Sequence, residues 1–216
     1  DLSEQFQIPQ KLYGREKEVE QLLETFAQVS EGATELLLVS GYSGIGKSAL
    51  VHEVHRPMVA KRGYFIEGKF DQFKRDIPYI SLIQAFQEFV RQILTESETE
   101  IQGWKQRLLE ALGSNGAVIT EVIPEMEWII GKQPGVPDLP PVELKNRFHL
   151  VFQSFIKACA TADHPLVIFL DDLQWADLSS LELLKVLVTD SQMKHLLLIS
   201  AYRNNEVDAS HPLTFT

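Results

Sequence analysis

The stretch that decides the fold is LLLVSGYSGIGKSALVHEV, residues 36–54. Its centre, Gly41-Tyr42-Ser43-Gly44-Ile45-Gly46-Lys47-Ser48, fits the phosphate-binding pattern G-x-x-x-x-G-K-S/T. An apolar run at 36–39 precedes the pattern, and a helix-compatible run at 49–54 follows it. A strand, a glycine-rich loop and a helix in this order predict a P-loop, which binds a nucleoside triphosphate with Mg²⁺.

The chemistry of this loop explains its residue types. Glycines at 41, 44 and 46 permit backbone dihedrals closed to other residues, and the N–H groups from Gly41 to Ala49 then converge on an anion. The N-terminus of the following helix adds a favourable dipole. We expect Lys47 to reach the β- and γ-phosphates and the Ser48 hydroxyl to ligate Mg²⁺. A glycine-rich turn that matches by accident is the alternative, and the flanking strand and helix argue against it.

Composition bounds the class of protein. The 216 residues suffice for one large domain or two small ones, and 44% hydrophobic residues support a substantial core. A net charge of −10 argues against a nucleic-acid partner, because phosphate contacts need clustered Lys and Arg. The single cysteine, Cys159, excludes an internal disulfide and suits the cytoplasm. Apolar runs stay well short of the ~18 residues of a membrane span, so we expect no membrane partner.

Strand and helix patterns alternate along the chain. Strands are predicted at 35–40, 64–69, 166–170 and 196–201, with helices between them, among them one that begins near a capping Asp177. This alternation predicts an α/β fold of three layers, a parallel sheet with helices on both faces. The continuous apolar runs at 36–39, 166–170 and 196–199 predict strands that are buried on both faces.

Two segments stand apart from this alternation. Residues 1–13 are polar and irregular and are expected to be a linker, which leaves 14–216 as the domain. Residues 98–141 are predicted to form a broken helical insertion that ends in a loop, because 133–141 hold four of the ten prolines. Trp104 and Trp128 in this insertion are expected to anchor the core.

A second half of the site follows the apolar run 166–170. Asp171 and Asp172 end this run, as carboxylates do in a Walker B motif, at the sheet edge where open α/β folds bind ligands. We expect Asp171 to bind Mg²⁺ through a water and Asp172 to orient the attacking water. Adjacent strand residues point to opposite faces, so both can face one metal only if the strand ends between them. The alternative is a strand that ends in a solvated Asp-Asp turn.

Arg203 lies just past the run 196–201. At the carboxyl end of a strand it can sense the γ-phosphate through charge-assisted hydrogen bonds. A solvated surface arginine is the alternative. Together, Lys47, Asp171, Asp172 and Arg203 are the predicted catalytic residues.

Four segments, taken in order, resemble the AAA-like ATPase domain of STAND signalling proteins, above all that of large bacterial multi-sensor serine/threonine–histidine kinases. They are Leu12-Tyr13-Gly14-Arg15-Glu16, the P-loop, Phe169-Leu170-Asp171-Asp172-Leu173-Gln174-Trp175-Ala176-Asp177 and Ala201-Tyr202-Arg203-Asn204-Asn205-Glu206-Val207. The resemblance covers residues 12–213.

The resemblance implies several properties. Gly14 and Arg15 would lie near the adenine and ribose of ATP, and the sheet would have the order of AAA-like P-loop ATPases, with inserted strands between the P-loop strand and its neighbour. The family sheet has five strands, so a fifth strand and a helical lid are expected after Thr216. ATP would be hydrolysed slowly, and its state would be passed to neighbouring kinase and sensor domains, with nucleotide-dependent self-association as a further partner interaction.

One departure keeps other functions open. Many ATPases of this broad class carry Asp-Glu where this chain has Asp171-Asp172, and the shorter Asp172 places a water less well. A non-hydrolysing scaffold that keeps bound nucleotide is therefore one alternative to a slow regulatory ATPase. An AAA-like ATPase of DNA transactions is another, against which the net charge of −10 argues.

Overall fold

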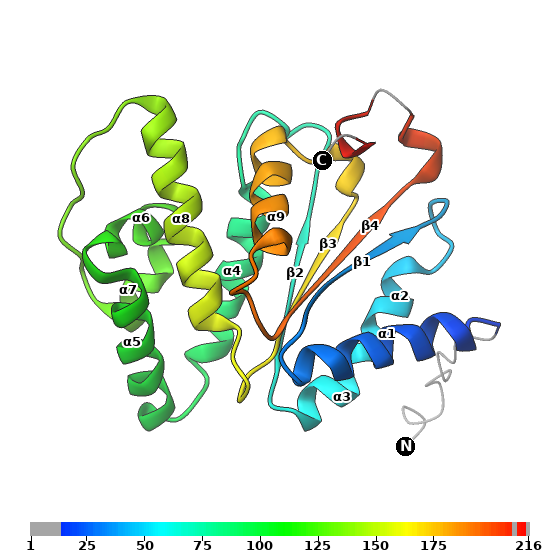
Figure 1. The fold of residues 1–216 in the computed structure, drawn as a ribbon, viewed down its shortest axis with the longest axis horizontal. Helices are drawn as coiled ribbons and strands as arrows, with labels where there is room; N and C mark the ends of the chain where they lie inside the picture. The colour runs from blue at the N-terminus through cyan, green and yellow to red at the C-terminus, as the bar shows by residue number, and fades with distance from the viewer. Residues whose placement is uncertain (1–13, 209–210, 215–216) are drawn as a thin grey trace, which may run out of the picture.

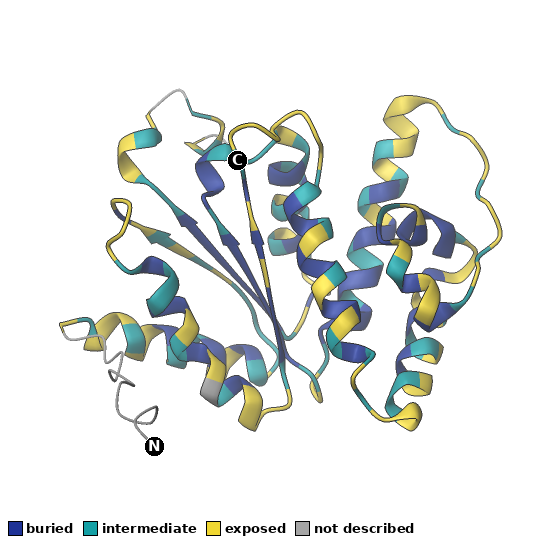
Figure 2. Cartoon of the chain, turned by 180° about the vertical axis from the view of Figure 1, so that it is seen from behind, coloured by how far each residue is buried: buried dark blue, intermediate teal, exposed yellow. Residues whose placement is uncertain are grey.

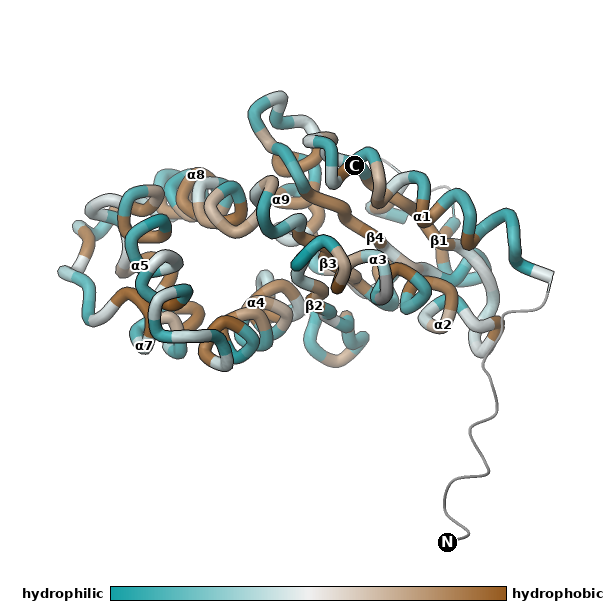
Figure 3. The backbone as a smooth tube through the Cα atoms, turned by 90° about the horizontal axis from the view of Figure 1, so that it is seen from below, coloured by the Kyte–Doolittle hydropathy of each residue, from teal (hydrophilic) through white to brown (hydrophobic). Residues whose placement is uncertain are grey.

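The structure is a computed structural model that describes residues 14–208 and 211–214. Four parallel strands form one sheet in the order β1-β4-β3-β2, between two layers of helices (Figures 1 and 3). The strands are β1 Thr34–Ser40, β2 Tyr64–Lys69, β3 Leu166–Asp171 and β4 Leu196–Tyr202. The predicted three-layer α/β fold is confirmed, and β4 is the inserted strand that lies between β1 and β3. The predicted linker, 1–13, lies outside the described residues.

Helices connect the strands. They are α1 Glu16–Ser30, α2 Lys47–Val51, α3 His55–Ala60, α4 Ile80–Ile93, α5 Glu98–Leu112, α6 Gly116–Val122, α7 Glu127–Ile130, α8 Pro141–Cys159 and α9 Leu178–Thr189. The helix after the P-loop is interrupted by a 3₁₀ turn, His52–Val54. Pro57 accounts for the interruption, because it lacks the N–H that would bond to the Glu53 carbonyl. In the described part of the chain, no helix combines the length and apolarity that crossing a bilayer requires.

Helices α1 to α3 cover one face of the sheet. Leu22, Phe26 and Val29 follow helical spacing on α1 and pack with Val51 of α2 against the strand residues that point toward them. Alternate residues of β3 and β4, such as Val167 and Phe169 of β3, point toward these helices. This packing fixes the helix that follows the P-loop against the sheet.

The opposite face carries the larger core. Helices α4, α8 and α9 pack on it, and α5 to α7 lie beyond them (Figures 1 and 3). Its centre is a group of fully buried aromatic rings, in which Phe86 contacts Phe89, Phe152 and Phe155 at centroid distances of 5.9, 5.4 and 5.0 Å. Trp104 is 3% exposed within this core, as predicted.

Two predictions about burial were wrong. Strand β1 is not buried on both faces: Leu36 and Leu38 are 44% and 56% exposed, because β1 pairs with β4 alone among the described strands and lies at the sheet edge (Figure 2). The prediction holds for the central strands β3 and β4. Trp128 does not anchor the core but is 68% exposed, because the one-turn helix α7 turns Ile129 and Ile130 inward instead.

Candidate functional site

The sheet topology brings the predicted site residues to one edge, at the top of Figure 1. In the parallel register, Ser40 of β1 pairs with Tyr202 of β4, and Lys69 of β2 pairs with Asp171 of β3. The Gly41 N–H donates to the Tyr202 carbonyl at 3.3 Å. The P-loop, the Asp171–Asp172 pair and the residue after β4 therefore meet at the carboxyl ends of neighbouring strands.

The P-loop curls around its own lysine. Gly44 and Gly46 have φ values of +76° and +89°, which disfavour any residue with a side chain, and Gly46 caps α2. Lys47 is buried, and its Nζ donates to the carbonyls of Gly41 and Tyr42 at 3.0 Å each. The ammonium group thus lies inside the loop, while Tyr42 is exposed to solvent.

The remaining loop residues complete this cradle. Ser43, Gly44 and Ile45 form its exposed rim, and Ala49 is half-buried in the first turn of α2. The N–H groups of that first turn lack intrahelical partners, so they are available to an anion. The loop therefore presents hydrogen-bond donors of the kind that bind an anion.

Ser48 and Asp171 lie together although 123 residues separate them in the sequence, and the Ser48 hydroxyl donates to Asp171 Oδ2 at 3.5 Å. Asp171 is the last residue of β3, and both side chains line a cavity of about 360 Å³ that Glu67 and Gln84 also border. Hydroxyl and carboxylate oxygens are hard ligands of the kind that Mg²⁺ prefers. The donor set therefore fits Mg²⁺.

Asp172 lies beyond the strand end and is held on several sides. Its φ is +54°, so the strand ends between Asp171 and Asp172, which was the condition for both to face one site. Its side chain is 5% exposed and lies 3.4 Å from Lys69 Nζ. The Gln174 amide donates to Asp172 Oδ1 at 2.9 Å. This carboxylate is buried and already paired.

Arg203 lies next to this carboxylate. Its Nε is 3.1 Å from Asp172 Oδ1, and its Nη1 donates to Glu206 Oε1 at 2.9 Å. The guanidinium stacks over the Trp175 ring at 4.7 Å from the centroid. The hydrogen bond to Glu206, followed by the charge of Asp172, raises the pKa of Arg203 above its ordinary value. The side chain is only 23% exposed, which differs from the solvated surface arginine that was the alternative.

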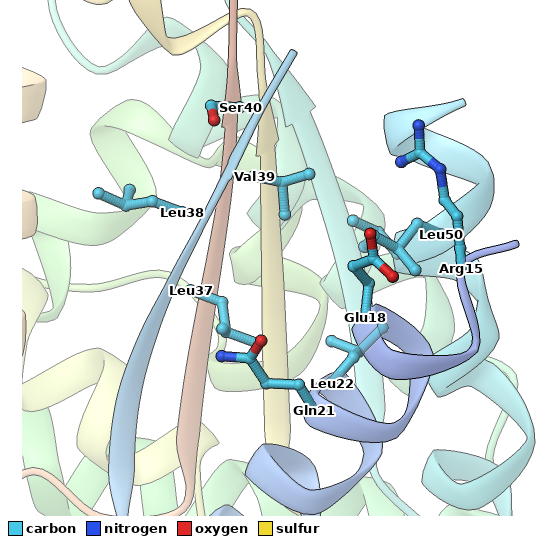
Figure 4. Close-up of a pocket in the computed structure, with 10 residues that line it drawn as sticks. Arg15, Glu18, Gln21, Leu22, Leu37, Leu38, Val39, Ser40 and Leu50 are labelled. Carbon is cyan, nitrogen blue, oxygen red and sulfur yellow. The ribbon is translucent and has the colours of Figure 1, made fainter. Parts of the chain in front are cut away.

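Arg15 borders the other side of the loop. Its Nη2 donates to the Ile45 carbonyl at 2.8 Å, and Gly14 N–H donates to Glu16 in the turn before α1. Beside Arg15 is a cavity of about 260 Å³ between α1, β1 and α2, shown in Figure 4. Glu18 and Gln21 line it with polar atoms, and Leu50 with apolar ones. The P-loop thus has one cavity on the side of Arg15 and another on the side of Ser48.

Sequence reasoning missed three residues around Asp172 and Arg203, namely Lys69, Gln174 and Glu206. Lys69 could have been found from the strand ends, because it closes β2 as Asp171 closes β3. Glu206 stands at i+3 from Arg203, a spacing that allows a contact within one turn. Gln174 lies within the segment 169–177 that carries the resemblance, but the segment does not reveal its contact: the Gln174 Oε1 accepts from the Arg203 N–H at 3.2 Å across the ends of two strands.

Comparison with known proteins identifies the family of this chain. Residues 11–199 match the AAA ATPase domain family. Hybrid signal transduction histidine kinase G of Dictyostelium discoideum is 45% identical over 181 residues, which are 84% of this chain and 5% of that protein. Histidine protein kinase 1 of Candida albicans is 25% identical over 193 residues, 82% of this chain and 8% of that protein. This chain therefore spans a small part of the length of these relatives. Its matched residues and its similarity to these proteins establish that the chain belongs to the AAA ATPase domain family.

Proposed function

We propose that this domain binds ATP with Mg²⁺, hydrolyses it slowly and acts as a regulatory switch in a larger signal-transduction protein of the STAND type. The observation that carries the proposal is the meeting of Lys47, Ser48 and Asp171 at one sheet edge, with Ser48 3.5 Å from Asp171. These are the residue types that a P-loop ATPase needs for the phosphates and the metal.

Each of these residues has a proposed role. The Lys47 ammonium exchanges its two loop carbonyls for the β- and γ-phosphates, while the loop N–H groups bind the same anion. Ser48 would hold Mg²⁺ directly and Asp171 would hold it through a water. When bound, Mg²⁺ neutralises charge on the phosphate oxygens.

Asp172 and Arg203 serve the terminal phosphate. Asp172 orients the attacking water, and Arg203 contacts the γ-phosphate. Slow hydrolysis follows from the surroundings of Asp172, because Lys69 and Gln174 already engage its carboxylate. Contact with these donors restricts the movement of the carboxylate toward a water.

The base and ribose of ATP occupy the cavity beside Arg15. Arg15 lines this cavity directly after Gly14 in the chain, and the bond from Arg15 to the Ile45 carbonyl connects this side to the P-loop. Glu18 and Gln21 offer hydrogen-bonding groups to the edge of a base, and Leu50 offers an apolar surface.

The relatives suggest what the switch controls. They are histidine kinases in which the matched segment is 5% to 8% of the length. We therefore propose that neighbouring kinase and sensor domains respond to the nucleotide state of this domain, and that this state also governs self-association.

The experiment compares ATP binding and turnover by the wild-type domain, in its parent protein, with those of Lys47→Ala. We expect ATP affinity to fall by about tenfold or more, because a charge-assisted contact to phosphate is lost. Lys61→Ala, which removes an exposed lysine at the end of α3, is the matched control and should bind ATP normally. Equal affinity in wild type and Lys47→Ala would refute the proposed site.

A second function, a scaffold that retains ATP without hydrolysing it, is favoured by the pairing of Asp172. Turnover separates the two. The switch predicts slow turnover above background that Asp172→Asn abolishes while ATP still binds. The scaffold predicts background turnover in both proteins, with tight retention of ATP.

A further inference from the structure

Arg203, the arginine proposed to contact the γ-phosphate, already has an anionic partner on its own loop. Its Nη1 donates to Glu206 Oε1 at 2.9 Å, and the Glu206 N–H donates to the Arg203 carbonyl at 3.0 Å. Both bonds fall within the 3₁₀ turn Asn204–Glu206 and its cap. The turn therefore fixes the carboxylate next to the guanidinium.

This ion pair lies beside the phosphate cradle. Strand β4 runs between β1, which leads into the P-loop, and β3, which leads into Asp172. The Gly41 N–H donates to the carbonyl of Tyr202, the residue before Arg203. A terminal phosphate held between the P-loop and Asp172 is thus the nearest competitor for the same guanidinium.

Of the two anions on Arg203, Glu206 is the one that can leave. Asp172 is 5% exposed, so separation from Arg203 would take one of its two cationic partners from a buried charge that water cannot reach. Glu206 is 30% exposed and can regain water when it is released. The Trp175 ring holds the Arg203 guanidinium in place while Arg203 Nη1 exchanges Glu206 for the phosphate.

We propose that Glu206 competes with the terminal phosphate of ATP for Arg203, and so sets how strongly the domain prefers ATP over ADP. The inference rests on the proposed function, in which Arg203 contacts the γ-phosphate. Glu206 touches no substrate in this scheme and acts as a positioning residue through Arg203. ADP lacks the competing phosphate, so it binds with the Arg203–Glu206 pair intact.

The test measures the dissociation constants of a non-hydrolysable ATP analogue and of ADP, each with Mg²⁺, by calorimetry on this chain. Glu206→Gln should raise the preference for the ATP analogue over ADP by about fivefold, a typical coupling between two sites. Glu206→Asp, which keeps the charge, should stay nearer to wild type. Glu88→Gln is the matched control, because Glu88 also contacts an arginine three residues along the chain, Arg91 at 3.3 Å, but on α4 rather than on the Arg203 loop.

A double-mutant cycle identifies Arg203 as the mediator. In an Arg203→Ala background, Glu206→Gln should leave the preference unchanged, and Arg203→Lys replaces Arg203→Ala if the latter unfolds. An unchanged preference in Glu206→Gln, or an equal gain in Glu88→Gln, overturns the inference while the proposed function stands. Failure of the wild-type chain to bind either nucleotide overturns both.

Discussion

The Ser48 hydroxyl lies 3.5 Å from Asp171 Oδ2, across 123 residues of sequence and two strands of the sheet. These strands are β1, which leads into the P-loop, and β3, which ends at Asp171, and β4 lies between them. The contact therefore crosses the carboxyl end of β4. The two oxygens that we assign to Mg²⁺ are therefore brought together by the fold itself.

Ser48→Ala should weaken binding of Mg²⁺·ATP by about tenfold while leaving metal-free ATP binding nearly unchanged, since only a metal ligand is lost. Isothermal titration of ATP, once in the presence of Mg²⁺ and once in the presence of a chelator, measures the two affinities. Ser30→Ala is the control, because the Ser30 hydroxyl donates to the Phe26 carbonyl of its own helix. An equal loss with and without metal would contradict the assignment of Ser48.

Asp177 caps α9, as predicted from the sequence. Its Oδ1 accepts from the Ser180 N–H at 2.8 Å, and its Oδ2 accepts from the Tyr79 N–H at 3.3 Å. Asp177→Ala should lower the free energy of unfolding by about 1–2 kcal/mol, the usual cost of a lost cap. Urea denaturation measures the change, with Asp138→Ala in an exposed loop as control. A loss as large in the control would refute the capping role.

Two tryptophans of the helical segment should respond in opposite ways. Trp104 is 3% exposed and Trp128 is 68% exposed. Trp104→Ala should cost about 3–5 kcal/mol of unfolding free energy. Trp128→Ala should stay within about 0.5 kcal/mol of wild type. Equal destabilisation, measured by chemical denaturation, would mean that α7 packs differently.

Stability should fall in mild acid. Burial, and secondarily the charge of Lys145, lowers the pKa of His149, while Glu182 opposes this shift. The Tyr79 hydroxyl lies 2.9 Å from His149 Nε2. Burial also lowers the pKa of His55. As pH falls through about 6.5, the pKa of histidine in the unfolded chain, the unfolded chain binds protons that the folded chain does not yet bind. The free energy of unfolding therefore decreases.

His149→Gln removes one of these two histidines and should weaken the dependence of the unfolding free energy on pH. Denaturation midpoints at about pH 5 and pH 8 measure it, because this interval brackets the unfolded pKa. A variant with the full wild-type dependence would show that His149 does not contribute.

Sequence reasoning succeeded where the pattern is local. The strand at 64–69 has the predicted ends, and the other three extend one residue beyond them, because apolar runs bounded by turn residues mark strands well. The position of β1 at the edge was not predictable, since an apolar run does not reveal which strands will neighbour it.

The candidate site shows the same difference between features with a local sequence pattern and contacts that depend on the fold. Lys47, Ser48 and Asp171 follow from motifs, whereas the pairing of Asp172 with Lys69 depends on the register between β2 and β3. Gln174 bridges Asp172 and the Arg203 N–H, a contact that needs the strand order as well. Contacts across strand ends therefore required the structure.

The central claim is that this chain binds ATP with Mg²⁺ in the P-loop. The most direct test titrates ATP into the wild-type chain with Mg²⁺ and with a chelator, and repeats both titrations with Lys47→Ala. We predict saturable binding that Mg²⁺ strengthens and that Lys47→Ala weakens by about tenfold or more. The absence of saturable binding by the wild-type chain in the presence of Mg²⁺ would contradict the claim.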